Sequence, residues 1–177
     1  QILWQGQDIS NLPPGVRPLT ILFQDQNLFP HLTLAQNVAM GLRPDLRLTS
    51  AQSQRVDQVL ERVGLQGLGP RKPGELSGGQ IGRAGLARAL LRSRPLLLLD
   101  EPFAALGPAL KADMLDLLAE VTTETGATLL MVTHDPADAR RIADQTVLVT
   151  DGLAHPPRPT KALLEDPPPE LRAYLGQ

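Results

Sequence analysis

Residues 95–102 read PLLLLDEP, and this stretch decides the fold. Four consecutive leucines between a proline and two acidic residues predict a short, fully apolar strand. Such strands are typical of parallel sheets covered by helices on both faces. A second apolar run, Thr128–Val132, ends in the polar sequence THD at 133–135. Because Leu110–Val121 has helical spacing between the two runs, the order predicts a right-handed βαβ unit in an open α/β sheet.

Other segments predict further strands and helices. Val16–Phe23 is expected to form a strand that ends at Gln24, and Thr146–Thr150 a second strand. Short helices are expected to about Gly41 and over Ala137–Ala143. Three capping boxes, each a Ser or Thr followed three residues later by Gln, predict helices that begin after Thr33, Thr49 and Ser77. The proline-rich tail after Asp151 is expected to lie on the surface.

Composition excludes several classes of protein. The chain has 177 residues, enough for one domain. Its formal net charge of −2 argues against a nucleic-acid binder, whose binding face is basic. It has no cysteine, which excludes disulfides, thiol catalysis and cysteine metal sites. No apolar run approaches about 18 residues, so no transmembrane helix is predicted. Residues 1–6 begin within a pattern and without Met, so we expect the chain to be a piece of a longer one.

Polar side chains follow three of the predicted strands. Ligands of open α/β sheets collect beyond the carboxyl ends of the strands, so Gln24, the acidic pair Asp100 and Glu101, and His134 are expected at one edge. Asp100 could hold Mg²⁺ near the phosphates of a nucleotide, and Glu101 could polarise an attacking water. An alternative of equal weight is that the two acids only cap the next segment. A lone histidine is more often structural than catalytic. His134 is a candidate only because it follows a predicted buried strand.

The sequence SGGQ at 77–80 opens a predicted helix. Backbone amides at a helix N-terminus, where the helix dipole is positive, form a ready site for an anion such as a phosphate. Glycine also permits close approach of the ligand to the backbone. The alternative is a capping box made by Ser77 and Gln80 alone. That alternative does not need both Gly78 and Gly79, which are unfavourable in the first turn of a helix.

Taken together, these motifs resemble those of ABC-type ATPases in order and spacing. The resemblance covers residues 6–152 and rests on four segments: Phe23-Gln24 resembles the Q-loop, LSGGQ at 76–80 the signature motif, LLLLDEPF at 96–103 the Walker B segment, and VTHD at 132–135 the switch-histidine loop. It implies a partial ABC nucleotide-binding domain of the P-loop-NTPase-like α/β class. Such a domain has a mostly parallel sheet and a helical subdomain.

The resemblance also implies how the chain is divided. Residues 1–32 would form the remainder of the catalytic core sheet with the Q-loop, and residues 33–93 a helical subdomain that ends in the signature helix. Residues 94–155 would complete the catalytic core with the Walker B segment, the D-loop and the switch histidine. Residues 156–177 would form a proline-rich C-terminal tail.

Roles for individual residues follow from the same resemblance. Two such subunits would form a homodimer around two ATP molecules, each with Mg²⁺. Asp100 would hold Mg²⁺, Gln24 would sense the ion and the water, Glu101 would act as general base, and His134 would contact the γ-phosphate. The ATP of the opposite subunit would be bound by the signature residues Ser77, Gly78, Gly79 and Gln80. Residues Gln24–Leu34 would line the cleft that receives the permease.

Within this family the chain is most similar to the ATP-binding subunits of bacterial thiamine importers. Segments that support this include Leu22–Gln24, Asn27–Phe29, His31–Thr33 and Ala35–Asn37, although importers for iron, polyamines, sulfate or molybdate share much of them. The likeness implies a peripheral subunit on the cytoplasmic face of the bacterial inner membrane. Its partners would be transmembrane permease subunits and, indirectly, a periplasmic solute-binding protein, with no nucleic acid.

The sequence also departs from the family. Residues 1–177 contain no Gly-x-x-x-x-Gly-Lys-Ser/Thr, the P-loop that the family has upstream, so we expect these residues alone to bind MgATP poorly and to fold badly. Ala104 and Gly107 stand where the D-loop of the family has Ser and Asp. One alternative is therefore a P-loop-less, non-catalytic subunit that completes a partner's ATP site through residues 77–80. Another alternative is a soluble ABC ATPase that acts on DNA or ribosomes. The net charge of −2 and the importer-like segment Gln24–Leu34 argue against it.

Overall fold

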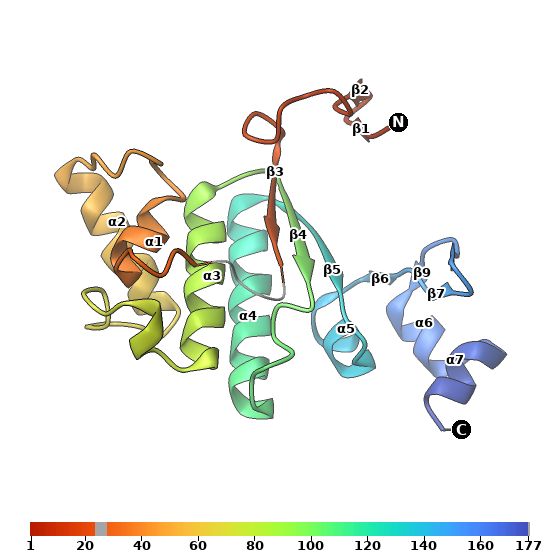
Figure 1. The fold of residues 1–177 in the computed structure, drawn as a ribbon. Helices are drawn as coiled ribbons and strands as arrows, with labels where there is room; N and C mark the ends of the chain where they lie inside the picture. Colours follow the sequence, from red (N-terminus) through yellow and green to blue (C-terminus); the bar gives the residue numbers. More distant parts are fainter. Residues whose placement is uncertain (24–27, 177) are drawn as a thin grey trace.

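A three-stranded parallel sheet lies at the centre of the molecule (Figure 1). The computed structural model describes residues 1–23 and 28–176. The strands lie in the order β3 (Leu19–Leu22), β4 (Leu96–Asp100) and β5 (Thr128–Val132). Leu22 pairs with Leu99, and Asp100 pairs with Val132, so the carboxyl ends of the three strands meet at one edge. The predicted α/β class with a parallel sheet is confirmed.

Two long helices cover one face of this sheet (Figure 1). They are α3 (Gly78–Arg92), which precedes β4, and α4 (Pro108–Thr125), which connects β4 to β5. The core between sheet and helices is made mainly of aliphatic side chains, among them Leu22, Leu97, Leu99, Leu86, Ala87, Met114, Leu115 and Leu118. Burial of this apolar surface is the main stabilising contribution to the fold.

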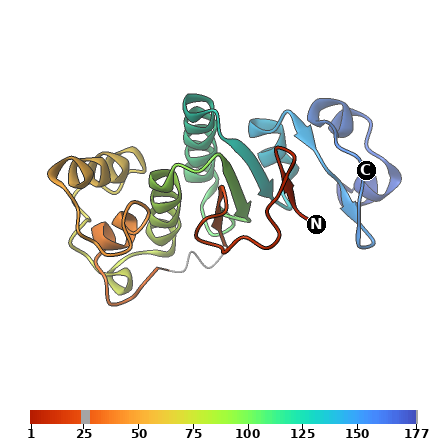
Figure 2. The ribbon, with the colours of Figure 1, turned by 90° about the horizontal axis from the view of Figure 1, so that it is seen from above.

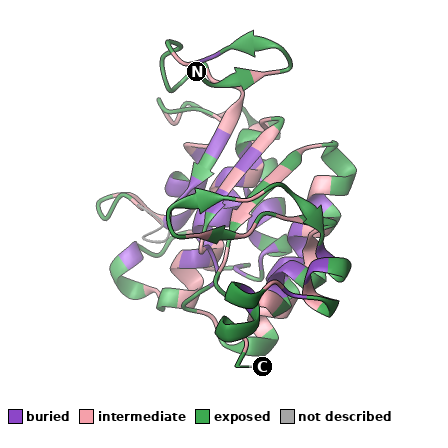
Figure 3. Ribbon diagram, turned by 90° about the vertical axis from the view of Figure 1, so that its right-hand side faces the viewer, coloured by how far each residue is buried: buried purple, intermediate pink, exposed green. Residues whose placement is uncertain are grey.

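The opposite face of the sheet is open to solvent. Ile21, Leu130 and Val132 point away from the core and are 45%, 59% and 56% exposed. More buried and less buried residues therefore alternate along the strands (Figure 3). The expectation that helices cover both faces is not met by the elements described here, because α3 and α4 pack into the same core cluster.

The helical subdomain is formed by α1 (Leu34–Ala39) and α2 (Ser50–Arg62), which pack against α3. The 3₁₀ turn η1 (Pro73–Glu75) leads into α3. All three predicted capping boxes are present, because the side chains of Thr33, Thr49 and Ser77 each accept a hydrogen bond from the amide of the Gln three residues later. The predicted starts of α1, α2 and α3 are therefore confirmed.

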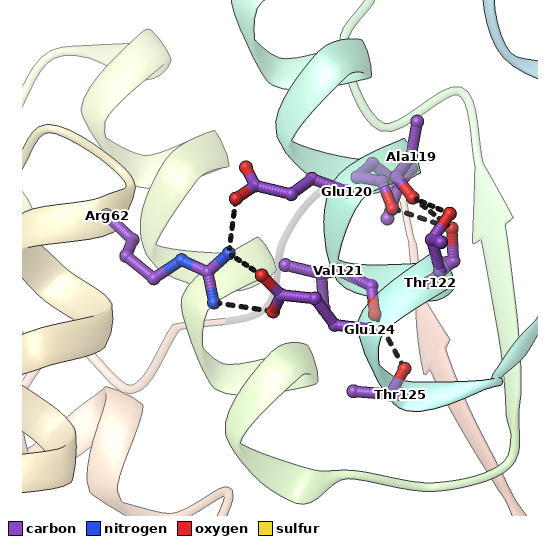
Figure 4. Close-up of polar contacts among 9 residues, drawn as sticks. Arg62, Ala119, Glu120, Val121, Thr122, Glu124 and Thr125 are labelled. Carbon is purple, nitrogen blue, oxygen red and sulfur yellow. Dashed lines mark hydrogen bonds and ion pairs between the residues drawn. The ribbon is translucent and has the colours of Figure 1, made fainter.

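An ion-pair cluster joins the helical subdomain to α4 (Figure 4). Arg62, the last residue of α2, lies 3.4 Å from Glu120 and 3.2 Å from Glu124. On α4 the hydroxyls of Thr122 and Thr125 donate to backbone carbonyls one turn earlier in the helix. Exposed ion pairs of this kind contribute little stability, roughly 0–1 kcal/mol each. The main connection between the helical subdomain and the sheet is therefore the continuous apolar core, which includes residues of α1, α2, α3, β4 and α4.

After β5 the chain forms a small unit of short elements (Figure 2). They are α5 (Pro136–Ile142), β6 (Gln145–Thr146), β7 (Val149–Thr150), β8 (Leu153–Ala154), β9 (Arg158–Pro159), α6 (Thr160–Glu165) and α7 (Pro169–Tyr174). The tail is therefore partly helical, with Leu163 and Leu171 buried. The single strand predicted over Thr146–Thr150 is wrong. Two-residue strands replace it, because β6 pairs with β9 whereas β7 turns back at Asp151-Gly152, both with positive φ, and pairs with β8.

A second tight hairpin lies at the start of the chain. Strands β1 (Leu3–Trp4) and β2 (Gln7–Asp8) pair across a turn in which Gln5 and Gly6 have φ values of 48° and 79°. The strand predicted over Val16–Phe23 is shorter than expected and is confined to β3. Within the described ranges, no helix is long and apolar enough to cross a membrane.

Candidate functional site

Glu101 and His134 face each other at the carboxyl edge of the sheet. Glu101 follows β4, and its amide donates to the carbonyl of Val132 at 3.1 Å, which extends the pairing with β5 by one step. His134 follows β5 by two residues, and its Nδ1 lies 3.1 Å from Oε2 of Glu101. Glu101 has a φ of 42°, a left-handed conformation that is unfavourable for a residue with a Cβ. The structure thus brings together two of the residues predicted from the sequence.

A small cavity opens beside this pair. Its volume is about 70 Å³, and its lining includes Glu101, Thr133, His134, Phe103 and Met131. The side chain of Glu101 is 30% exposed and that of His134 is 65% exposed. The carboxylate is therefore partly shielded by protein and still reachable by a water molecule, which suits a group that takes a proton from water.

Asp100 is the last residue of β4 and is exposed at the same edge. Among residues 1–23 and 28–176, no group of three or more His, Asp or Glu side chains could hold a metal ion. Mg²⁺ often uses only one or two protein carboxylates and takes its other oxygen ligands from phosphate and water. The donor set at Asp100 therefore fits Mg²⁺ bound together with a nucleotide.

Helix α3 begins with two glycines that the local backbone does not require. Neither Gly78 nor Gly79 has a positive φ. A Cβ added at Gly78 would meet nothing within 4 Å, and one at Gly79 would meet only the tips of Leu106 and Leu110, at 3.2 and 3.8 Å. The capping box of Ser77 and Gln80 also forms without help from these glycines. The first amides of a helix lack intrahelical acceptors, so this turn can bind an anion.

The start of α3 lies at the same end of the molecule as the edge that holds Asp100 (Figure 1). This follows from the topology, because α3 leads directly into β4 and runs back along it. Gly82 is close to the segment after Glu101, since its added Cβ would lie 4.0 Å from the carbonyl of Pro102. Residues 77–80 nevertheless do not line the cavity beside Glu101. Gln24, the remaining predicted site residue, lies outside the described residues.

A cluster of charged side chains next to His134 was not predicted from the sequence. Lys111 of α4 lies 2.7 Å from Asp135 and 2.7 Å from Asp138, and Thr133 donates to Asp138 at 2.7 Å. The feature of the sequence that could have indicated this cluster is the pair Asp135 and Asp138, three residues apart at the start of α5. Tyr174 of α7 also contacts this region through its hydroxyl. We call residues 133–135 the His134 loop.

Charges in this cluster stabilise one another. The hydrogen bond from Lys111, together with the amide of Ala137, lowers the pKa of Asp135 below its ordinary value of 3.8. Burial lowers the pKa of Lys111, but its hydrogen bonds to Asp135 and Asp138 outweigh that effect and raise the pKa above 10.5. Lys111 and Asp135 are therefore both charged at neutral pH.

Comparison with known proteins identifies the family. The sequence profile described as "ABC transporter" matches residues 1–104, more than half of the chain. The chain belongs to the ABC transporter family. As its motifs predict, it is an ATP-binding subunit of the ABC-type ATPase class.

Several relatives of this ABC transporter chain carry the name thiamine import ATP-binding protein ThiQ. The protein of Cereibacter sphaeroides is 66% identical over 176 residues, which are 99% of this chain and 76% of the relative. The protein of a Ruegeria species is 60% identical with the same coverage. That of Photorhabdus laumondii is 49% identical over 98% of this chain and 74% of the relative.

A solved structure has the same fold. It is that of the ATP-binding cassette MJ0796, a dimer in a post-hydrolysis state bound to ADP and phosphate. The TM-score is 0.79 at 28% identity, and the match covers 89% of this chain and 72% of that one. The predicted ABC-type nucleotide-binding fold is therefore confirmed.

Proposed function

We propose that this chain is the ATP-hydrolysing subunit of a bacterial ABC importer for thiamine. The support for the solute is the name of the relatives at 66% and 60% identity, which align with 99% of the chain. The observation that supports the site best is the contact between Glu101 and His134 at the ends of neighbouring parallel strands.

Glu101 acts as the general base. Its Oε2 lies 3.1 Å from Nδ1 of His134, and its Oε1 is left to take the proton of the water that attacks the γ-phosphate. The imidazole of His134 lies beside the carboxylate and is 65% exposed, so it is free to contact an oxygen of the γ-phosphate. The closeness of Glu101 and His134 at two strand ends supports these roles, because positioning is the main source of rate in phosphoryl transfer.

Asp100 and Gln24 would hold the Mg²⁺ that accompanies ATP, and the ion would neutralise charge on the phosphate oxygens. The position of Asp100 supports this role. It is exposed at the end of β4, one residue before the proposed base Glu101.

A second copy of the chain completes each ATP site. The γ-phosphate held by the partner subunit is bound by Ser77, Gly78, Gly79 and Gln80. Two observations support this role. These residues do not line the cavity beside Glu101, and neither glycine is required by the fold of α3. The dimeric state of the similar ATP-binding cassette supports a homodimer.

The permease docks near Gln24–Leu34, on the cytoplasmic face of the bacterial inner membrane. Within this segment Phe29 is 41% exposed, and the backbone around it is held by the buried side chain of Asn37. A fixed loop with an exposed aromatic ring suits a protein interface. A periplasmic solute-binding protein takes part indirectly, and no nucleic acid is involved.

The test is Glu101→Gln in the complete transporter, with Glu165→Gln as a matched control on the exposed surface of α6. Loss of the general base should lower ATP turnover by about 10²–10⁴-fold, whereas the control should keep full turnover. Unchanged turnover in Glu101→Gln would remove Glu101 from the mechanism. It would favour the non-catalytic alternative, for which the comparisons give no support.

The solute is tested separately by uptake of labelled thiamine into cells that depend on this transporter. Glu101→Gln should abolish the uptake. ATPase activity of the wild-type transporter that responds to another solute but not to thiamine would contradict thiamine as the solute and leave the ATPase assignment in place.

A further inference from the structure

We infer that Lys111 is a positioning residue for ATP hydrolysis, which holds the His134 loop in place from helix α4. This inference rests on the proposed role of His134 in the reaction. Lys111 itself lines the cavity beside Glu101 but makes its charged contacts with Asp135 and Asp138.

The geometry of the Lys111 contacts differs from that of an ordinary surface ion pair. Its Nζ lies 2.7 Å from a carboxylate oxygen of each aspartate, and the side chains of Lys111 and Asp138 are only 19% and 9% exposed. By contrast, Lys161 and Glu165 lie 3.9 Å apart with 86% and 65% of their side chains exposed. Partly buried, hydrogen-bonded charges hold their geometry much better than exposed ones, so the first cluster can fix a loop.

Both neighbours of His134 belong to this cluster. Thr133 donates from Oγ1 to Asp138 at 2.7 Å, and the amide of Asp135 donates back to the same Oγ1 at 3.1 Å. Asp135 in turn accepts from Lys111 and from the amide of Ala137. The backbone on each side of His134 is therefore fixed, although the imidazole is 65% exposed. The exposed ring depends on this support to meet Glu101.

Lys111 also connects the loop to the start of α4. Its amide donates to the carbonyl of Gly107, the N-cap of this helix, at 2.9 Å. Gly107 has no side chain with which to contact the His134 loop. Lys111 therefore provides the link between the turn at Gly107 and the loop, and a movement of that turn would be passed to His134 through it.

The experiment compares Lys111→Met, which keeps the aliphatic stem, with Lys111→Arg, which keeps the charge, in the complete transporter. Lys161→Met is the matched control for loss of a lysine. We expect Lys111→Met to lower kcat by roughly 10–100-fold with KM for ATP changed less than about twofold, since a small misplacement of a catalytic group costs up to about 10²-fold. Lys111→Arg should restore most of the activity, and Lys161→Met should match the wild type.

A second background shows whether Lys111 acts through His134. In His134→Ala, the change Lys111→Met should cause no further loss, because residues that act as a unit are not additive. A full additional loss, or a wild-type kcat in Lys111→Met alone, would overturn the inference. If His134→Ala keeps wild-type turnover, the proposed role of His134 is overturned instead, and the inference with it.

The pair Thr133→Val and Thr133→Ser tests the same cluster without removing a charge. Val lacks the hydroxyl that donates to Asp138, whereas Ser retains it. Thr133→Val should lower kcat, and Thr133→Ser should not. Equal activity of the two variants would count against a positioning role for the cluster even if Lys111→Met fails to fold.

Discussion

The hydroxyl of Tyr174 donates a hydrogen bond to the backbone carbonyl of His134, and the two oxygens lie 2.6 Å apart. Tyr174 is the last residue of α7, in the segment that the sequence presents as a proline-rich tail. The His134 loop is thus held by two separate elements, α4 through Lys111 and the C-terminal helix through Tyr174. The tail therefore contacts the candidate active site directly.

Tyr174→Phe removes this hydrogen bond and leaves the ring. We expect kcat for ATP to fall by about 2–10-fold in the complete transporter, the equivalent of a net hydrogen bond of about 0.5–1.5 kcal/mol. Steady-state ATPase measurements check this, with Tyr174→Leu as the comparison that removes the ring as well. Wild-type kcat in Tyr174→Phe together with a loss in Tyr174→Leu would show that the ring matters and the hydrogen bond does not.

Gly78→Ala separates the fold of α3 from the proposed phosphate site. The added Cβ meets no atom within 4 Å, and Ala has the better helix propensity, so the free energy of unfolding should stay the same or rise. ATP turnover should nevertheless fall at least about tenfold, because the methyl group would block close approach of a phosphate. Denaturation and ATPase assays check both parts.

The matched control for Gly78 is Gly15→Ala, since a Cβ at Gly15 also meets nothing within 4 Å and Gly15 has no positive φ. This variant should keep both stability and turnover. Full turnover in Gly78→Ala would mean that the backbone at this position is not approached by a ligand.

Asn37→Ala should lower the free energy of unfolding of the complete subunit by about 2–4 kcal/mol. Asn37 is fully buried, accepts from the amide of Phe29 and donates to the carbonyls of Phe29, Leu32 and Thr33. Truncation leaves the amide of Phe29 and the carbonyl of Leu32 without this partner, and each buried unsatisfied group costs about 1–3 kcal/mol. Urea denaturation measures the change.

The control for Asn37 is Gln54→Ala on the exposed surface of α2, which should change stability by less than about 0.5 kcal/mol. Similar stabilities of the two variants would contradict the structural role of Asn37 in the loop where the permease is proposed to dock.

Stability should depend on pH through Lys111 and Asp135. The folded pKa of Asp135 is lowered from 3.8, so its contribution is present above that value and is lost as the pH falls through the folded pKa. The folded pKa of Lys111 is raised from 10.5, so its contribution is present below that value and is lost as the pH rises through the folded pKa. Stability should therefore fall at both extremes.

Urea denaturation of the full-length chain from about pH 3 to about pH 11 tests this dependence. Lys111→Met should lose less stability than the wild type at each extreme, since the pair is already broken. Lys161→Met should follow the wild type. Superimposable pH profiles of Lys111→Met and the wild type would show that the pair does not contribute to folding.

Local sequence established much of the fold. The starts of α1, α2 and α3 follow from capping boxes that span only four residues, and the strands β4 and β5 follow from unbroken apolar runs. The hairpin at Asp151-Gly152 was missed although this dipeptide is a strong turn signal. The preceding run Thr146–Thr150 has the β propensity of one strand, but propensity does not show that its two ends pair with different strands.

Candidate catalytic residues were also found from local patterns, because polar residues that directly follow apolar strands must reach one edge of a parallel sheet. Their contacts could not be found in this way. Glu101 meets His134, Lys111 meets Asp138, and Tyr174 meets His134 only after β4, α4, β5 and the C-terminal helices have packed together. Capping and periodicity depend on residues a few positions apart, whereas these hydrogen bonds depend on the relative placement of whole elements, which packing of the core sets.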